Sequence, residues 1–235
     1  MKTSTFAPAI PASAATPAPR ISSHRFARSF AALSAILIPL LLVVMTACSD
    51  DSKPTTEKPE AKRPELITAR SAFQKLYVAA RGWNPDAKPY RIESSTTSDG
   101  NGQDGKWAIW RSSFASAASH TTKPYIWSGS VAEGAPSRGV NPGTEDSYSP
   151  SNSSTQVFDM AFLKIDSDQA CAAAQKHGGD KILEKDPQTP ILYVCDWNHN
   201  TNELTWHVTY GGSRDAYKLT VAVNASTGEF IRVEK

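Results

Sequence analysis

The hydrophobic positions between Pro64 and Gly82 recur at steps of three and four residues. These apolar positions are Leu66, Ala69, Phe73, Leu76, Tyr77 and Ala80. Such spacing gives a helix one apolar stripe, and a proline before it and a glycine after it are ordinary start and stop signals. The pattern therefore predicts an amphipathic helix in this segment.

Short segments that suit β-strands follow the predicted helix. They are rich in β-branched and aromatic residues and read KPYRIES (88–94), GKWAIWRSSF (105–114) and KPYIWSGSV (123–131). The turn-rich segment TTSDGNGQDG (96–105) separates the first two, and we expect it to form a long exposed hairpin loop. One helix followed by strands is therefore predicted for residues 66–130.

The same order of elements is predicted again from Asp166. The segment DSDQACAAAQKHGG (166–179) has an N-cap residue at its start, an alanine-rich middle and two glycines at its end, which together predict a short helix. The strand-like segments that follow are PILYVCDW (190–197), NELTWHVTYGG (202–212), DAYKLTVAV (215–223) and GEFIRVE (228–234). The last two form a hairpin in which Gly228 is free to take a positive φ.

The two halves resemble each other in the order of their elements. KWAIWRSSF aligns with ELTWHVTYG at an offset of roughly 95 residues, and the flanking helix and strands recur in one order. We interpret this as a duplicated unit; chance similarity between two ordinary α+β stretches is the alternative. The predicted fold class is α+β, with a helix-plus-antiparallel-sheet unit at 66–130, a Gly/Pro/Ser-rich connection at 131–165 and a second such unit at 166–235.

The longest apolar run of the chain, residues 30–47, has no charged residue. Basic residues precede it and acidic residues follow it, as in a secretory signal. Its end, MTAC (45–48), resembles the bacterial lipobox, although that family usually has Leu, Val or Ile where Met45 stands. The resemblance implies that residues 1–47 are a lipoprotein signal peptide and that Cys48 becomes the lipid-carrying N-terminus. An uncleaved membrane anchor and a buried core helix are the alternatives.

Residues 48–65 mix both charge signs with repeated prolines and hold no large apolar side chain. Such a segment cannot bury enough surface to offset the entropy lost on ordering, so it is predicted to be a flexible tether. Both the lipoprotein signal and the uncleaved anchor would hold the folded body at a membrane, outside the cytoplasm.

The charge of the body argues against nucleic-acid binding. The full chain carries a net charge of +2, but four of its 25 basic residues and none of its 23 acidic residues precede Cys48. The remainder is therefore slightly acidic and lacks the positive field that collects phosphates. No cluster of basic residues with interleaved aromatic residues changes this expectation.

The second half of the chain, and especially its end LTWHVTYGGSRDAYKLTVAVNASTGEFIRVEK (204–235), resembles a PepSY domain. The shared features are a helix, a strand with a tryptophan, a second strand and a closing hairpin, although the family more usually has Asp where Asn224 stands. The resemblance covers 166–235 well and 66–130 weakly. It implies an extracytoplasmic, non-catalytic module without a cofactor, of a kind in which some members are thought to restrain peptidases.

Cys171 and Cys195 form an even pair once Cys48 is used for lipid. One lies in the second predicted helix and the other in the strand expected beneath it, so a disulfide is predicted in an oxidising compartment. A metal site that adds His177 and His199 is an alternative, but its spacings match no familiar zinc pattern. Two unpaired thiols are the third possibility, and no metal site is adopted.

Tryptophans are dense in the predicted strands. Alternation should put Trp107 and Trp110 on opposite faces of one strand, so at least one of them is expected on the sheet face away from the helix. The candidate binding face comprises Trp107, Trp110, Trp127, Trp206 and His207, because exposed aromatic residues anchor partners. Alternation puts His207 opposite Trp206 on its strand, so His207 is expected to be solvent-exposed or to lie at a sheet face. Burial of the tryptophans on both faces or their contact at a strand edge, and an ordinary surface histidine at 207, are the alternatives.

No reaction is encoded by a recognisable motif. Ser112, Ser113 and His120 have types used in nucleophilic catalysis, but neither a nucleophile elbow nor a supporting acid accompanies them. The predicted function is a non-catalytic binding module tethered to the cell envelope, which restrains a peptidase or binds another envelope protein. A structural or assembly lipoprotein without a discrete ligand is the alternative, and a metal-binding protein or an enzyme is a minor one.

Overall fold

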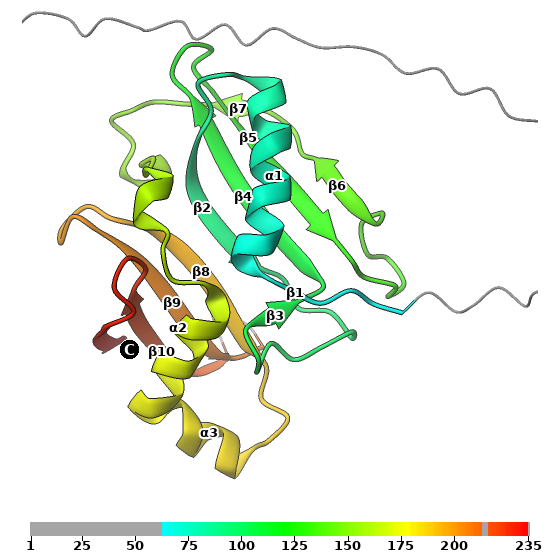
Figure 1. Ribbon diagram of the computed structural model, residues 1–235, viewed down its shortest axis with the longest axis vertical. Helices are drawn as coiled ribbons and strands as arrows, with labels where there is room; N and C mark the ends of the chain where they lie inside the picture. The colour runs from blue at the N-terminus through cyan, green and yellow to red at the C-terminus, as the bar shows by residue number, and fades with distance from the viewer. Residues whose placement is uncertain (1–62, 213–215, 235) are drawn as a thin grey trace, which may run out of the picture. The chain divides into compact units, whose positions relative to one another are not determined.

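The computed structural model describes residues 63–212 and 216–234, which form an α+β fold with helices against a large antiparallel sheet (Figure 1). The predicted α+β class is confirmed. The predicted signal segment, Cys48 and most of the tether lie outside the described residues. Within the described residues, none of the helices has both the length and the apolar character needed to cross a membrane.

The large sheet of the described residues has nine strands, and every neighbouring pair in it is antiparallel. Its order is β11-β10-β9-β8-β2-β4-β5-β6, with β7 also paired to β5. These strands are β2 (Lys88–Ser94), β4 (Ile109–Ser116), β5 (Thr121–Ser128), β6 (Gly139–Pro142), β7 (Asp146–Ser147), β8 (Ile191–Asn198), β9 (Glu203–Gly211), β10 (Tyr217–Asn224) and β11 (Phe230–Glu234). A separate two-stranded sheet joins β1 (Ile67–Thr68) to β3 (Lys106–Trp107).

Two antiparallel meanders meet at the pair formed by β2 and β8. Helix α1 (Ala69–Trp83) precedes β2 in the chain, and helix α2 (Ser167–Ala174) precedes β8. Both helices lie on the same face of the sheet, in front of it in Figure 1, with α1 over the first meander and α2 over the second. Within the described residues, the opposite face of the sheet therefore carries no α-helix.

The short helical segments extend or connect these elements. The 3₁₀ turns η1 (Ser153–Thr155) and η2 (Met160–Phe162) lie in the predicted connection, which also supplies the edge strands β6 and β7. After α2 the chain continues through a π-turn, η3 (Gln175–Gly179), into helix α3 (Asp180–Lys185). Gly178 has a φ of +112° at this kink, so the predicted glycine stop redirects the helix instead of ending it.

The register of the sheet relates the two halves by an approximate two-fold axis at the Glu93–Val194 pair. Ser94 and Cys195 directly follow these two paired residues along their own strands. Ser94 pairs with Trp110, whereas Cys195 pairs with Trp206. The two tryptophans therefore occupy matching places in the two meanders.

The hydrogen bonds of these tryptophans match as well. The Trp110 indole nitrogen donates to the Ile67 carbonyl at 2.8 Å, and the Trp206 indole nitrogen donates to the Ile165 carbonyl at 3.0 Å. Each accepting carbonyl lies two residues before the first residue of a helix, α1 in one case and α2 in the other. Each tryptophan thus fixes the start of its helix against the sheet.

The first turns of α1 and α2 contact each other. The Arg70 amide donates to the Asp166 carboxylate at 2.9 Å, and the Ala69 amide donates to the Ser167 hydroxyl at 2.9 Å. The α1 N-cap residue, Thr68, makes no capping bond with its own side chain. The start of α2 therefore satisfies amides that α1 leaves open.

Two sequence predictions about local structure were wrong. The predicted strand at 105–114 is broken at Ala108, with Trp107 in β3 and Trp110 in β4. The predicted exposed loop at 96–105 packs against the second half, because the Tyr193 hydroxyl donates to the Gly102 carbonyl at 2.6 Å. The Ser167 hydroxyl likewise donates to the Gly105 carbonyl at 2.6 Å.

Candidate binding surface

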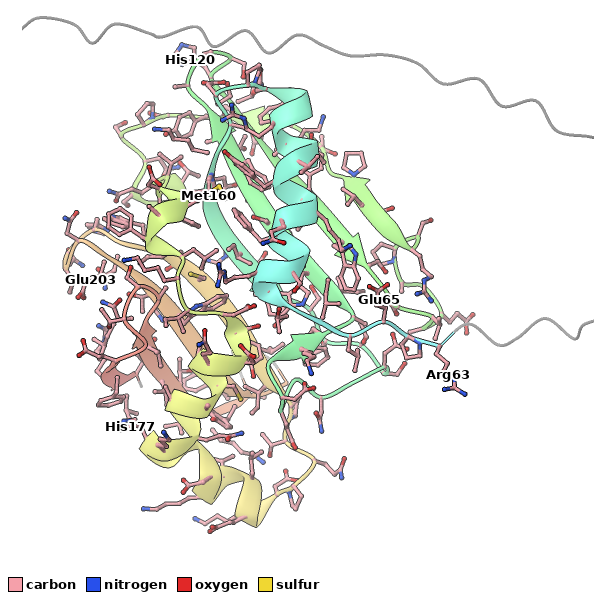
Figure 2. All side chains as sticks on the ribbon, in the orientation of Figure 1. Arg63, Glu65, His120, Met160, His177 and Glu203 are labelled. Carbon is pink, nitrogen blue, oxygen red and sulfur yellow. The ribbon has the colours of Figure 1, made fainter. Side chains whose placement is uncertain are left out.

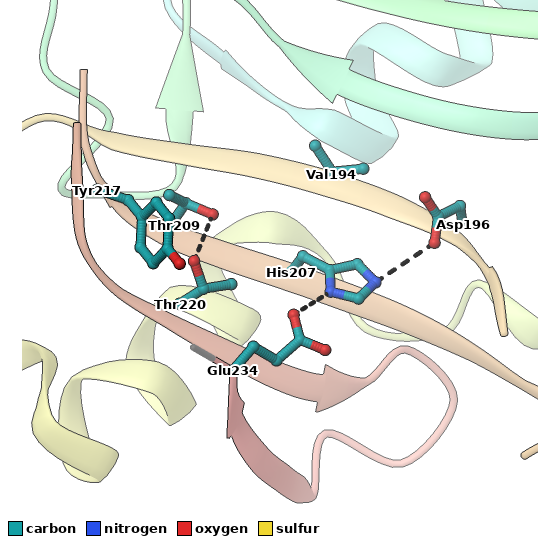
Figure 3. Close-up of a pocket in the computed structure, with 7 residues that line it drawn as sticks. All are labelled: Val194, Asp196, His207, Thr209, Tyr217, Thr220 and Glu234. Carbon is teal, nitrogen blue, oxygen red and sulfur yellow. Dashed lines mark hydrogen bonds and ion pairs between the residues drawn. The ribbon is translucent and has the colours of Figure 1, made fainter. Parts of the chain in front are cut away.

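The sheet face without helices carries a connected set of charged side chains. Alternation along β9 explains their direction: Trp206 is fully buried on the helix-covered face, so the next residue, His207, points to the opposite face. Figure 3 shows His207 there with Asp196 from β8 and Glu234 from β11. The sequence prediction that His207 lies on a sheet face opposite Trp206 is confirmed.

His207 forms ion pairs with two carboxylates. Its Nδ1 lies 2.6 Å from a Glu234 oxygen, and its Nε2 lies 3.3 Å from an Asp196 oxygen, as the dashed lines in Figure 3 mark. Burial by itself would lower the pKa of His207, but the hydrogen bonds to Asp196 and Glu234 outweigh it and raise the pKa to about 9. The hydrogen bond from His207 lowers the pKa of Glu234 in turn. At neutral pH the imidazole is therefore positively charged.

The ion pairs continue across the seam between the two halves. The Arg91 guanidinium lies 2.9 Å from Asp196 and 2.8 Å from Glu93, and Glu93 is 3.5 Å from Arg111. At the other end, Arg232 pairs with Glu234. We call this set the ion-pair row; its members are Arg111, Glu93, Arg91, Asp196, His207, Glu234 and Arg232. It joins strands β4, β2, β8, β9 and β11 on one face of the sheet.

A hollow of about 480 Å³ lies beside His207 on this face. Besides the three ion-paired residues, its lining comprises Val194, Thr209, Tyr217 and Thr220 (Figure 3). The Thr209 and Thr220 hydroxyls are 3.1 Å apart, and Tyr217 is 43% exposed. The hollow is therefore lined by hydroxyl groups, the Tyr217 ring and one aliphatic side chain, and it lies beside the ion-pair row.

The four tryptophans assigned to the candidate binding face are not on a surface. Trp107, Trp110, Trp127 and Trp206 are each at most 3% exposed. The interpretation as exposed anchors was therefore wrong, and the alternative of burial is correct for all four. The physical reason is that each indole packs beneath a helix or loop, and three of them donate hydrogen bonds to backbone carbonyls there, Trp107 to Ile191 among them.

Cys171 and Cys195 do not form the predicted disulfide, because both are free thiols. Cys171 contacts Tyr193, which lies two residues before Cys195 on β8. The Cys171 thiol donates to the Gln103 carbonyl instead, at 3.3 Å. Burial raises the pKa of both thiols, so both are held in the neutral form.

The other residues considered for catalysis or metal binding do not lie close together. The Ser112 hydroxyl donates to the Arg91 carbonyl, whereas His120 lies at the tip of the hairpin between β4 and β5 (Figure 2). His177, at the far end of the view, stacks on Phe230 with ring centroids 3.9 Å apart. Among the residues that the structure describes, His, Cys, Asp and Glu side chains form no group that could hold a metal ion.

Sequence reasoning identified only His207 among the members of the ion-pair row. A signal for some of the others was present, because charged residues alternate in two of the strands. Arg91 and Glu93 are two residues apart on β2, and Arg232 and Glu234 are two residues apart on β11. Such alternation indicates a polar face, but the pairing of the strands is needed to see that the charges meet.

The comparisons with known proteins found no match among protein-family models, curated proteins or solved structures. The resemblances to a PepSY domain and to a lipobox therefore stay predictions from the sequence. The fold and the charged face have to be interpreted from their own geometry.

Proposed function

We propose that this protein is a non-catalytic binding module that recognises another protein through the helix-free face of its sheet. The observation that carries the proposal is the position of the ion-pair row beside the hollow, on the one sheet face that both helices leave uncovered. A sheet face with a hollow beside a charged row offers both shape and charge that a protein partner could match.

The state of His207 supports recognition over proton transfer. Both ring nitrogens are engaged by carboxylates, and the pKa of about 9 keeps the ring protonated at neutral pH. A protonated imidazole held in this way is a fixed positive charge and is poorly suited to accept a proton from a substrate. We therefore assign to His207 an electrostatic and positioning role in binding.

The two halves are interpreted as two PepSY-like units, at 66–130 and 166–235. The matching hydrogen bonds of Trp110 and Trp206, each to a carbonyl two residues before a helix, support a duplicated unit. A lipid on Cys48 and a tether at 48–65 would hold the module at the membrane on the extracytoplasmic side. The partner is then another envelope protein, and a peptidase restrained by binding is one such partner.

A structural or assembly role without a discrete ligand is the second candidate. One observation favours it: each carboxylate of the ion-pair row is already matched by cations of the same row. Such internal pairing stabilises a face whether or not a partner covers it. The two roles predict different results when the hollow is blocked. A binding module would lose its partner, whereas a structural protein without a discrete ligand would not.

The test is quantitative affinity capture from an envelope extract with three forms of the protein. The wild-type protein is compared with Tyr217→Arg, which places a bulky charge at the hollow, and with Val78→Arg, which does so on helix α1. Val78 is 74% exposed, so it provides a matched surface control. We expect a protein that wild type and Val78→Arg retain equally and that Tyr217→Arg loses. Equal retention by all three forms, or loss with Val78→Arg alone, would exclude the proposed surface.

A further inference from the structure

We propose that the feature recognised on the partner is an extended acidic segment that crosses the strands from Arg111 to Arg232. The inference rests on the proposed function and adds the chemistry of the partner. It depends on three observations about the helix-free face: a continuous line of paired residues, one surplus cation within the ion-pair row and exposed arginines at both ends of the line.

The continuous line follows from the register of the sheet. Directly paired residues connect Arg111 on β4 to Arg232 on β11, each on the helix-free face. The successive partners are Arg111, Glu93, Val194, His207, Ala222 and Arg232. Five steps between neighbouring strands cover about 24 Å, and an extended chain needs about seven residues to span that distance.

The ion-pair row has one more cation than it has carboxylates. Arg111, Arg91 and Arg232 are always charged, and His207 is protonated at neutral pH because its pKa is about 9. Against these four cations stand three carboxylates, from Glu93, Asp196 and Glu234. A carboxylate from a partner would therefore neutralise the surplus charge of this row, whereas a further cation would increase repulsion within it.

The surplus donors lie at the ends of the line. The side chains of Arg111 and Arg232 are 46% and 44% exposed, compared with 25% for Arg91 in the middle. Within the described residues, each terminal arginine has one carboxylate partner, and a guanidinium carries five N–H donors. Exposed guanidinium groups with spare donors bind carboxylates in a bidentate manner.

The hollow beside His207 gives the segment a place for one side chain between its acidic residues. Tyr217 and the Thr209–Thr220 pair line this hollow next to the line of paired residues. An acidic segment would therefore contact arginines at its two ends and seat a middle residue against hydroxyl groups. The spacing between the acidic residues, and not the total negative charge, is what this geometry selects.

The test uses the purified full chain and fluorescein-labelled peptides in fluorescence-anisotropy titrations. One peptide carries two aspartates about seven residues apart in a Ser/Val sequence, matching the span of the line. Its controls carry the aspartates about three residues apart, or asparagines in their place. Arg111→Gln and Arg232→Gln are compared with Arg81→Gln, an exposed arginine on helix α1. Anionic lipid vesicles are titrated in parallel.

We expect the widely spaced peptide to bind most tightly, and each of Arg111→Gln and Arg232→Gln to weaken it about tenfold while Arg81→Gln leaves it unchanged. Equal binding of the asparagine peptide, equal binding at either spacing, equal loss with Arg81→Gln, failure to bind, or tighter binding to vesicles would each overturn the inference. If a captured protein still depends on Tyr217 after such a result, the proposed function stands and only the acidic segment is excluded.

Discussion

The backbone amide of Arg70, in the first turn of α1, donates a hydrogen bond of 2.9 Å to the carboxylate of Asp166. Asp166 is the N-cap of α2, where the same carboxylate accepts a bond from the Ser167 amide at 2.7 Å. One negative charge therefore lies at the positive ends of two helix dipoles, one from each half of the protein. This contact links the two helices on the covered face of the sheet.

Replacing Asp166 by alanine should destabilise both helix starts at once. Loss of an N-cap costs about 1 kcal/mol for one helix, so we expect Asp166→Ala to lower the free energy of unfolding by about 2 kcal/mol. Asp168→Ala is the control, because Asp168 is an exposed acid in the first turn of α2 that caps only its own helix. Urea denaturation measures both changes. Equal losses for the two variants would contradict a shared cap.

Gly179 should be irreplaceable, although its backbone is helical. A methyl group added at Gly179 would overlap the buried Tyr210 hydroxyl on β9, whereas a methyl group at Gly82 in α1 would meet open space. We expect Gly179→Ala to lower the free energy of unfolding by about 1–3 kcal/mol through overpacking. Gly82→Ala should raise it by up to about 1 kcal/mol, because alanine favours a helix. Similar effects of the two substitutions would show that the Tyr210 contact is not as described.

The ion pairs of His207 should make stability depend on alkaline pH. The folded-state pKa of about 9 is above the ordinary value of 6.5, so the stabilisation is fully present below pH 6.5 and is lost as the pH rises through 9. The loss is at most about 3 kcal/mol. Unfolding free energies measured between these pH values should fall for the wild type and stay flatter for His207→Gln. An unchanged slope in His207→Gln would contradict the assignment.

Cys48 should carry the lipid that holds the protein at the membrane. Cys48→Ala is expected to leave the signal uncleaved and to abolish lipid attachment, because the acylated thiol is missing. Intact mass measurement and detergent partitioning of cell extracts check this outcome. Cys171→Ala is the control, since that thiol is buried and lies far from the signal in the sequence. Identical mass shifts and partitioning for wild type and Cys48→Ala would refute the lipobox interpretation.

Periodicity in the sequence was sufficient to locate α1, α2 and most strands, because these patterns depend on neighbours a few residues apart. It could not assign faces correctly to Trp107 and Trp110, since the break at Ala108 moves Trp107 into a different sheet. It also could not place Cys171 relative to Cys195, because a helix above a strand can slide along it. In the structure Cys171 contacts Tyr193 and both cysteines are free thiols.

The ion-pair row could not be predicted from the sequence for a related reason. His207 was located by alternation with Trp206, which needs only one strand. Its partners Asp196 and Glu234 come from two other strands, and their meeting depends on the register of three strand pairs. Local patterns predict which residues share a face, whereas register decides which residues touch.

Site-specific photocrosslinking in living cells tests the proposed recognition surface most directly. A benzoylphenylalanine at Tyr217, which is partly exposed at the hollow, is compared with one at Val78, which is exposed on α1. Because the crosslinker reacts only within contact distance, the account predicts a discrete adduct with one protein from position 217 and none from position 78. An adduct from position 78 alone, or the absence of any adduct from position 217, would contradict recognition through the helix-free face of the sheet.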